Sequence, residues 1–588
     1  MLKQAARAVA VMLRYARRPA ALCIALMLAQ AVLAPVTIYL TGRLVNGIGE
    51  YAARAGTFEA VASQAAMLIG ALLVQALAEL FCRFARADCT HYLQHGFSDV
   101  VLGKFKRLEY ACFEDPDVLN SLERMGAEPH NRINELFFNI VSVAAALVSL
   151  VGTVIVFAQV SAWFAVAYGA LLAPMLWFYF KSAQEEQKLW NTEMPNWRRR
   201  TYLSALLADK HAVSELKIFG ALPYILKKWK ITADKFRGEF VRLKLSSIKF
   251  NVLAAAIECV WAAYVIVSLL TRLTGGTVTL GAFVACITSL GATLSLSSAM
   301  GYNFSFISRD CIEMHHFGLF MQLPEVSGGG GSDAPITAPE IRFDDVYFTY
   351  PKTSGPVLRG VTFSVRPGER VALVGENGAG KSTIVKLLCG LYKPDSGDIR
   401  IGGAPIAELS ASQLRRVFSV VFQDFGSYEL TLRENLAFGD IGKLGDDGAL
   451  RGALERGLWS GSMALDTNLG KIEDDGVDLS GGQWQRIAVA RSLVGDSAFV
   501  ILDEPTAALD PLAESRMYET FQSVLRERGC VMISHRLASA KLADKIIVLN
   551  GGAVAQSGAH GELMKAGGLY RDMFTAQAAW YADGGGAE

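Results

Sequence analysis

Six long apolar segments constrain this chain more strongly than any other feature of its sequence. Each is about 20 residues long, and a helix of that length reaches about 30 Å, the thickness of the hydrocarbon core of a bilayer. Lipid offers an open backbone no hydrogen-bond partner, so such segments must be helical. One segment could be a buried core helix of a soluble protein, but six of them predict a membrane domain. They lie near Ala20–Leu40, Ala60–Cys82, Leu136–Ala158, Ala162–Phe180, Asn251–Leu270 and Val278–Met300.

Composition and charge divide the chain into two unlike halves. Hydrophobic residues make up 52% of the 588 residues and charged residues 19%, whereas soluble domains carry about 25% charged residues. Residues 1–330 hold 31 Lys and Arg against 23 Asp and Glu, and the acidic excess lies in the remainder. A basic, apolar half is therefore joined to an acidic, more polar half. The net charge of +1 gives no polyelectrolyte character that would indicate a nucleic-acid partner.

The nine cysteines are scattered along the chain and form no C-x-x-C pair. A disulfide framework or a structural zinc site needs such recurring spacings. We therefore interpret the cysteines as reduced, small apolar side chains.

Basic residues in the connections predict the orientation of the segments, because they are enriched on the cytoplasmic side. They gather before the first segment, in residues 83–135 and in residues 182–250, whereas the opposite side holds only Arg43, Arg54 and Arg272. Both termini and both long connections are thus expected in the cytoplasm. The Arg-rich N-terminus also resembles a mitochondrial presequence, but it has no serine in its first twenty residues. We favour an amphipathic helix on the membrane surface.

The two long connections are too long to be simple loops. Apolar residues recur at three- and four-residue spacing in Val100–Leu108 and Leu203–Leu216, which is typical of helices. We expect rods that continue the spans beyond the membrane and turn near Phe113–Leu122 and Phe219–Trp229. A cytoplasmic partner would contact those two turns.

A Gly, Pro and Ser-rich stretch at Ser327–Glu340 marks a linker. Strand-like and helix-like segments alternate after it, as in an α/β domain. The predicted fold class is an α-helical six-span transmembrane domain with long cytoplasmic helical extensions, followed by an α/β P-loop nucleotide-binding domain. The expected domains are residues 1–321 for the membrane domain, 322–339 for the linker, 340–580 for the α/β domain and 581–588 for a tail.

A phosphate-binding loop follows the strand-like run Val371–Val374. Its pattern is G-x-x-x-x-G-K-[ST] before a helical segment. Glycines let backbone N–H groups turn toward phosphate oxygens, and the helix N-terminus adds partial positive charge. Lys381 would reach the β- and γ-phosphates, and Ser382 would bind Mg²⁺. The whole loop is Gly375, Glu376, Asn377, Gly378, Ala379, Gly380, Lys381, Ser382 and Thr383.

Two adjacent carboxylates end the apolar run Phe499–Leu502. A buried parallel strand delivers such side chains at its carboxyl edge, where open α/β sheets bind ligands. Asp503 would hold Mg²⁺ through water, and Glu504 would act as the general base on the attacking water. A solvated strand end is the alternative for a carboxylate pair on its own.

A second anion-binding turn precedes the helical segment Trp484–Leu493. Ser480 and the amides of Gly481 and Gly482 can face a phosphate there, with Gln483 beside them. The chain already has one phosphate loop. The Ser480 turn therefore suggests a site that is completed across a dimer, although the spacing of the two motifs alone does not prove this.

These motifs, in this order after six spans, resemble an ATP-binding cassette (ABC) transporter of the exporter type. The resemblance covers essentially the whole chain, and it implies ATP and Mg²⁺ as cofactors. By the matching motifs, Tyr350 would stack on adenine, and Gln423 would bind Mg²⁺ and couple to the membrane domain. Asp510 matches the D-loop aspartate and His535 the switch histidine that contacts the γ-phosphate.

The resemblance also implies an assembly and a location. Two cassettes would enclose two ATP molecules, so the chain is expected to be a half-transporter that dimerises in the bacterial plasma (inner) membrane. Its intact motifs favour a homodimer, with a paralogous half-transporter as the alternative partner. One departure is Asp474, which stands where exporters often carry Glu in a Gly-Glu-x-Gly element before the signature motif.

The cargo leaves weaker traces. Ionisable groups within spans are costly and default to functional candidates, although each could instead form an interhelical hydrogen bond or ion pair. The candidates are Glu258, Gln75 and Glu79. Cassette details around Phe425 and Gln485 look similar to exporters of bacterial peptides, such as lantibiotics. A lipid flippase, a multidrug exporter and a siderophore importer with the exporter fold remain alternatives.

Overall fold

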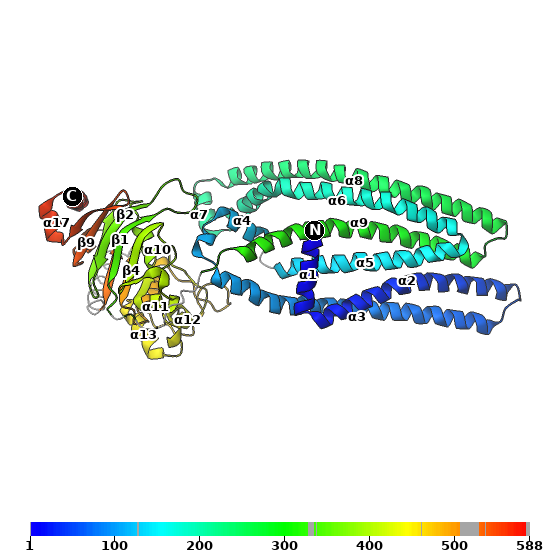
Figure 1. Cartoon of the computed structure of the whole chain (residues 1–588), viewed down its shortest axis with the longest axis horizontal. Helices are drawn as coiled ribbons and strands as arrows, with labels where there is room; N and C mark the ends of the chain where they lie inside the picture. The colour runs from blue at the N-terminus through cyan, green and yellow to red at the C-terminus, as the bar shows by residue number, and fades with distance from the viewer. Residues whose placement is uncertain are drawn as a thin grey trace. The chain divides into compact units, whose positions relative to one another are not determined.

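The computed structural model describes residues 2–125, 129–326, 334, 336, 338–459, 461–505, 528–534 and 537–583. The chain divides into two compact units. One comprises Met1–Arg107 and Pro116–Leu323, and the other comprises Leu108–Asp115 and Pro324–Glu588. The first is helical and the second is an α/β domain (Figure 1). Asp510 and His535 lie outside the described residues.

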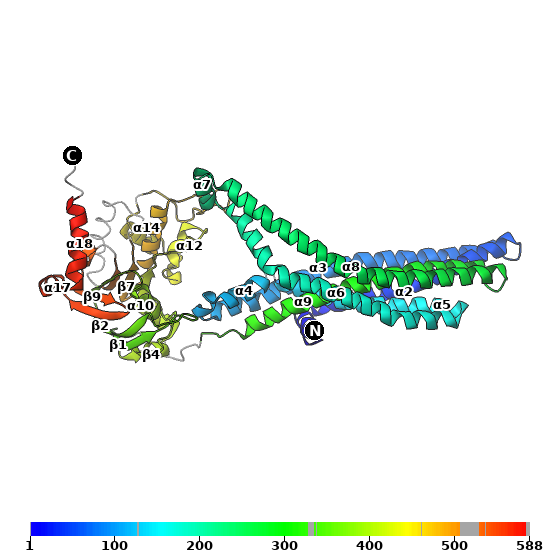
Figure 2. The ribbon, with the colours of Figure 1, turned by 90° about the horizontal axis from the view of Figure 1, so that it is seen from above.

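The helical unit holds, among the described residues, six helices long and apolar enough to cross a membrane. Most extend far past a bilayer: the longest has 53 residues, which at 1.5 Å per residue is about 80 Å. The spans thus continue as long rods (Figures 1 and 2). The helices of this unit are α1 (Leu2–Tyr15), α2 (Arg17–Ala52), α3 (Phe58–Arg107), α4 (Pro116–Met125), α5 (Pro129–Val160), α6 (Ala162–Leu206), α7 (Lys210–Ile218), α8 (Leu222–Thr274) and α9 (Leu280–Gln322).

The long helices pack in pairs, α2 with α3, α5 with α9 and α6 with α8. A glycine contact brings α2 close to α9: a Cβ atom on Gly281 would lie 1.9 Å from the carbonyl oxygen of Gly42. Small residues permit such close approach between membrane helices. The amide of Asn46 secures the contact, because its oxygen accepts a hydrogen bond of 2.7 Å from the Gly281 N–H.

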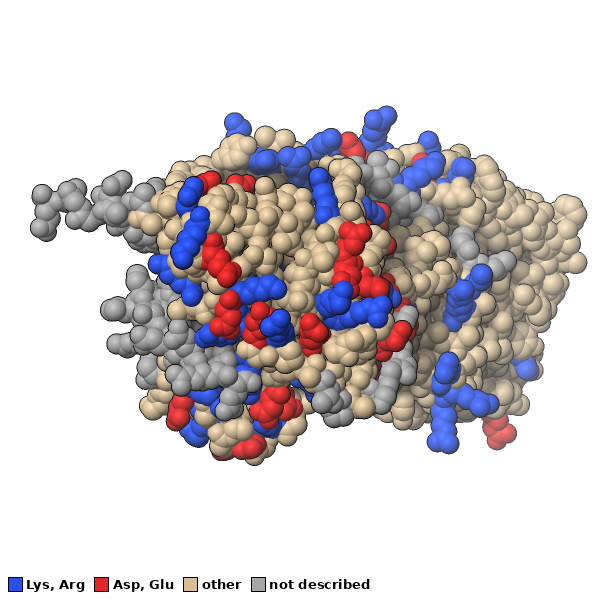
Figure 3. All heavy atoms as spheres, turned by 60° about the vertical axis from the view of Figure 1, so that its left-hand side comes forward, with Lys and Arg blue, Asp and Glu red and all other residues tan. Residues whose placement is uncertain are grey.

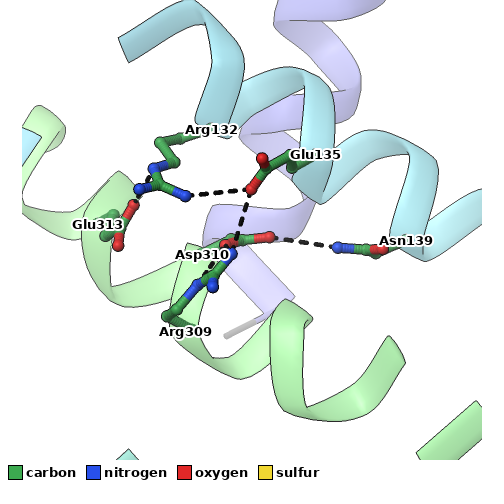
Figure 4. A network of polar contacts seen from close by, with 6 residues as sticks. All are labelled: Arg132, Glu135, Asn139, Arg309, Asp310 and Glu313. Atoms are coloured by element: carbon green, nitrogen blue, oxygen red, sulfur yellow. Dashed lines mark hydrogen bonds and ion pairs between the residues drawn. The ribbon is translucent and has the colours of Figure 1, made fainter. Parts of the chain in front are cut away.

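A network of charges ties α5 to α9 (Figure 4). Arg132 pairs with Glu313 at 2.7 Å, and Arg309 pairs with Glu135 at 3.1 Å. Asp310, which is fully buried, accepts hydrogen bonds from Arg309 and from the amide of Asn139. The charges are compensated across the two helices, which a buried carboxylate requires.

The described residues of the α/β unit form two sheets. A four-stranded antiparallel sheet has the order β2-β1-β4-β5, and a six-stranded sheet has the order β10-β9-β3-β8-β7-β6, parallel except for β10. The strands are β1 (Ile341–Phe348), β2 (Leu358–Val365), β3 (Arg370–Gly375), β4 (Ser396–Ile401), β5 (Ala404–Pro405), β6 (Phe418–Val421), β7 (Phe499–Asp503), β8 (Gly529–Ile533), β9 (Lys545–Asn550) and β10 (Ala553–Gly558).

Two apolar cores cover the two faces of the parallel sheet. Ala372 and Val374 of β3 belong to one core, and Val371 and Leu373 belong to the other, because successive side chains of a strand point to opposite faces. The helices are α10 (Lys381–Leu388), α11 (Ala411–Val417), α12 (Leu432–Ala437), α13 (Asp447–Arg456), α14 (Gly481–Ser492), α16 (Leu537–Ala540), α17 (His560–Ala566) and α18 (Leu569–Asp583), with the 3-10 turns η2 (Ile406–Glu408) and η3 (Ile441–Lys443).

One short segment of the first long connection belongs to the α/β unit. Leu108–Asp115, which contains the 3-10 turn η1 (Tyr110–Phe113), clusters with the cassette. Leu108 forms a β-bridge with Glu325, and the Glu109 N–H donates to the Pro324 carbonyl. The sequence predicts the whole connection as part of the membrane domain. The structure differs because this segment makes its contacts with the cassette.

Candidate functional site

The phosphate loop is shaped by three glycines with positive φ. Gly375 ends β3, Gly378 lies in the turn, and Gly380 caps α10 with φ 98°. A Cβ atom on Gly380 would lie 2.4 Å from Leu358 Cδ2, and one on Gly375 would lie 2.4 Å from the Leu549 carbonyl oxygen. A larger residue would therefore be strained and would clash at either end of the loop.

Lys381 lies inside this loop. Its ammonium donates to the carbonyls of Gly375 at 2.8 Å and Glu376 at 2.9 Å. Only 6% of the residue is exposed. Burial lowers the pKa of Lys381, while Glu504 and Asp503 oppose this shift. The loop thus holds a buried positive charge where phosphate oxygens would lie.

A cavity of about 620 Å³ opens over the loop. It gathers side chains that are far apart in the sequence and that the motifs predict to act together. Its lining residues are Tyr350, Val357, Asn377, Gly378, Gly380, Lys381, Ser382, Thr383, Gln423 and Glu504. The sequence analysis did not predict Val357, because this residue belongs to no motif. It lines the cavity because it directly precedes β2.

The two carboxylates lie where β7 ends. Asp503 is the last residue of the strand and is 4% exposed, and Glu504 lines the cavity. Glu504 adopts φ 51°, a left-handed conformation that is uncommon for a residue other than glycine. Its N–H donates to the Ile533 carbonyl of β8 at 3.1 Å, which fixes the backbone there. Strained backbone of this kind concentrates at functional sites.

Tyr350 follows β1 and lines the same cavity. Its hydroxyl is 3.1 Å from the Thr383 hydroxyl on α10. The rings of Phe348 and Tyr392 pack edge-on against the Tyr350 ring, with centroids at 5.0 and 5.4 Å. The ring is therefore held in place and can offer a flat surface to a base.

The second turn that the sequence predicts to bind an anion caps α14 but does not line this cavity. Ser480 accepts a hydrogen bond from the Gln483 N–H, and the Gln483 side chain accepts one from the Ser480 N–H. Ser480 and Gly481 are exposed, and Gly482 is half-buried. The first amides of α14 thus face outward from the fold, and the structure does not bring this turn together with Lys381 of the same chain.

The three cargo candidates do not form one cluster. Glu258 on α8 is 6% exposed and accepts a hydrogen bond from the Tyr179 hydroxyl of α6. Gln75 and Glu79 lie on α3, where Glu79 is exposed and pairs with Arg83 of the same helix. Glu258 therefore joins two helices, whereas Glu79 makes a local contact on its own helix.

Comparisons with known proteins agree with this geometry. Residues 358–507 match the family described as ABC transporter. The chain is 32% identical to the subtilin transport ATP-binding protein of Bacillus subtilis, over 80% of this chain and 78% of that protein. It is 28% identical to the nisin transport ATP-binding protein of Lactococcus lactis subsp. lactis, over 79% of each. It is 34% identical to the ATP-dependent lipid A-core flippase of Alcanivorax borkumensis, over 61% of this chain and 62% of that protein.

The fold has a solved counterpart in the structure of a bacterial Atm1-family ABC exporter with ATP bound. The TM-score is 0.77, with 24% identity over 98% of this chain and 99% of that chain. The fold is thus that of an ABC exporter. The chain belongs to the ABC transporter family. It is a multi-pass membrane protein and an ATP-hydrolysing transport ATPase, which confirms the expected fold class and activity.

Proposed function

We propose that this chain is a half-transporter that exports a peptide or another amphipathic compound as a dimer. One observation carries the dimer: the Ser480 turn is exposed and does not line the cavity of its own chain. A second cassette would supply that turn to the phosphate loop. Because Lys381, Glu504 and Ser480 are all present in one chain, two identical copies would form two complete sites. A paralogous half-transporter is the alternative partner.

The cavity supports a division of labour in ATP hydrolysis. Lys381 and the loop amides would hold the β- and γ-phosphates, and Tyr350 would stack on adenine. Glu504 would take a proton from the attacking water. Asp510 would contribute the D-loop and His535 would contact the γ-phosphate; both lie outside the described residues. The exposed α14 turn, with Ser480, Gly481, Gly482 and Gln483, would close the partner's site.

The cavity residues fit Mg²⁺ by the chemistry of their donors. Ser382 and Gln423 line the cavity and Asp503 lies buried beside it. Their hydroxyl, amide and carboxylate oxygens are the hard donors that Mg²⁺ prefers. When bound, the ion would neutralise charge on the phosphates. These residues would orient it, while Lys381 supplies a second positive charge.

Peptide cargo is supported by the two relatives whose names specify subtilin and nisin transport, and lipid cargo by the lipid A-core flippases. The excess of basic residues in the long connections supports a cytoplasmic location for both termini and the cassette, with the spans in a bacterial inner membrane. Glu258, Gln75 and Glu79 are the candidates for contact with cargo. Glu258 is favoured, because its carboxylate is buried among α6 and α8.

The test is ATPase activity of the full-length protein in lipid nanodiscs, with Glu504→Gln as the blank. The panel contains cationic amphipathic peptides, lipid A and ferric siderophores. Stimulation by peptides, together with ATP-dependent uptake of the same peptide into inside-out vesicles, is the expected result. Stimulation and uptake of lipid A or a siderophore without any peptide response would overturn the peptide proposal.

A further inference from the structure

A carboxylate outside the cassette sequence lies beside the nucleotide cavity. Glu114 belongs to the segment Leu108–Asp115, which clusters with the α/β unit. It accepts a hydrogen bond of 2.8 Å from the Lys386 ammonium and another from the Tyr392 hydroxyl. Lys386 lies on α10, one turn and a half after the phosphate-binding Lys381. Glu114 therefore contacts the helix that begins at the phosphate loop.

Lys386 stands among three tyrosine rings. Its ammonium is 5.2 Å from the ring centre of Tyr350, 5.7 Å from that of Tyr110 and 5.8 Å from that of Tyr392. Tyr392 in turn packs edge-on against Tyr350 and Tyr110, at 5.4 and 5.6 Å. Cations at such distances are attracted by the ring faces, and perpendicular ring pairs are favourable.

The charges of Glu114 and Lys386 support each other. Burial would raise the pKa of Glu114, but its hydrogen bonds with Lys386 and Tyr392 outweigh this and leave the pKa below its ordinary value. Burial likewise opposes the charge of Lys386, and the bond to Glu114 raises the pKa of Lys386 above its ordinary value. Both groups are thus ionised at neutral pH, and the ring cluster surrounds a fixed positive charge.

We propose that Glu114 is a positioning residue for adenine: through Lys386 and Tyr392 it holds the ring of Tyr350 in the orientation that a base needs. The proposal rests on the assignment of Tyr350 to adenine. A segment of the first membrane connection thereby completes the nucleotide site. Coupling between two binding events is reciprocal. Bound ATP therefore strengthens the binding of this segment to the cassette by the same factor by which the segment strengthens ATP binding.

Two further ion pairs hold the same segment and supply a control. Asp115 pairs with Lys352 at 2.6 Å, and Glu109 pairs with Lys393 at 3.9 Å. The Lys393 side chain is 67% exposed, so this pair is well screened. Glu109→Gln removes the same charge from the same segment as Glu114→Gln, and its partner is not the lysine among the rings. It separates positioning of Tyr350 from general attachment of the segment.

The experiment compares ATP with inorganic tripolyphosphate, which offers phosphates without a base. Affinities are measured by equilibrium binding to the full-length protein in nanodiscs, in a Glu504→Gln background that prevents turnover. Glu114→Gln should weaken ATP binding about fivefold, the effect of losing a charged and an aromatic contact. Tripolyphosphate affinity should stay within about twofold, and Glu109→Gln should leave both ligands within about twofold.

A double-mutant cycle tests whether Glu114 acts through Tyr350. Once Tyr350→Ala has removed the ring, Glu114→Gln should cost ATP affinity nothing more. Lys386→Gln, a change made from the cassette side, should reproduce the selective loss if Glu114→Gln fails to fold. With Glu504 intact, the KM for ATP should rise while kcat at saturation stays within about twofold.

Equal weakening of ATP and tripolyphosphate, or additive losses in the cycle, would overturn the proposal, because the segment would then support the cassette in general. A wild-type protein that fails to bind ATP would contradict the proposed function instead. The two failures are therefore distinguishable.

Discussion

Two helices of the α/β unit begin at turns that the sequence predicts to bind anions, and the surroundings of these turns differ. α10 starts at Gly380, whose positive φ and close contact with Leu358 admit only glycine. α14 starts at Ser480 with a self-contained capping box. The first turn lies at the base of a cavity with a buried lysine, whereas the second is exposed and needs no other element of its chain. In the dimer that we propose, the α10 turn would form one half of a nucleotide site, and the α14 turn would complete the site of the partner.

The largest expected effect concerns the cavity over the α10 turn. Glu504→Gln removes the proposed general base while keeping nearly the same side-chain shape, so hydrolysis should fall by about 10²- to 10⁴-fold. ATP binding should persist, and the closed dimer should accumulate. Phosphate release and equilibrium binding of ATP to the same preparation measure the two quantities. Near-normal turnover would remove Glu504 from its role.

The second prediction tests whether the α14 turn acts in the partner's site, by mixing two inactive chains. Lys381→Ala disables the phosphate loop, and Ser480→Arg blocks the α14 turn with a bulky charge. Each homodimer should be inactive. If α14 serves the partner's loop, a mixed dimer keeps one site with an intact loop and an intact turn, and ATPase activity returns. Differently tagged copies purified in sequence supply the mixed dimer. No recovery would indicate that α14 serves its own chain.

The third prediction concerns the wall of the cavity. Tyr350→Ala removes the aromatic surface and should weaken ATP binding about tenfold, within the range for stacking of a base on a side chain. Tyr350→Phe keeps the ring and loses only the hydrogen bond to the Thr383 hydroxyl, so the loss should be within about threefold. Fluorescence titration with a labelled ATP analogue measures both. Equal losses would mean that the hydroxyl, not the ring, matters.

These sites also differ in how far the sequence predicts them. Contiguous motifs predicted the loop at Gly375–Thr383 and the carboxylates at Asp503 and Glu504, because neighbouring residues of one strand–loop–helix or strand end keep their local geometry. Tyr350 and Gln423 depended on resemblance to a family. The contact between Glu114 and Lys386 had no local signal, since the two residues are 272 positions apart.

The helical unit shows the same contrast between local and distant information. Hydropathy predicted six membrane-crossing helices, because twenty apolar residues in a row fit few other structures. The rods were predicted too: α3 continues as one helix from Phe58 to Arg107, past the end of the span at Cys82, as the helical spacing in Val100–Leu108 indicates. No Pro or Gly lies between Cys82 and Gly96, so nothing local stops the helix where the span ends. Which polar groups meet, as Glu258 and Tyr179 do, depends on packing between helices.

The smallest expected effect separates the two possible roles of Ser480. Its side chain caps α14, and in the proposed dimer its hydroxyl would also contact a phosphate bound by the partner. Ser480→Thr keeps a hydroxyl that can still cap the helix, so the free energy of unfolding should change by less than about 0.5 kcal/mol. Ser480→Ala loses the cap and should cost about 1 kcal/mol. Thermal unfolding with and without ATP measures these changes.

The effect of ATP on the melting temperature decides whether Ser480 is only a helix cap or also contacts a phosphate. If Ser480 acts only as a cap, Ser480→Ala should lower the melting temperature equally with and without ATP, because ligand affinity is unchanged. If the hydroxyl also donates to a phosphate across the dimer, the stabilisation by ATP should itself shrink in Ser480→Ala and be retained in Ser480→Thr. The second outcome is expected, since the exposed hydroxyl lies at the N-terminus of α14, where the helix dipole favours an anion.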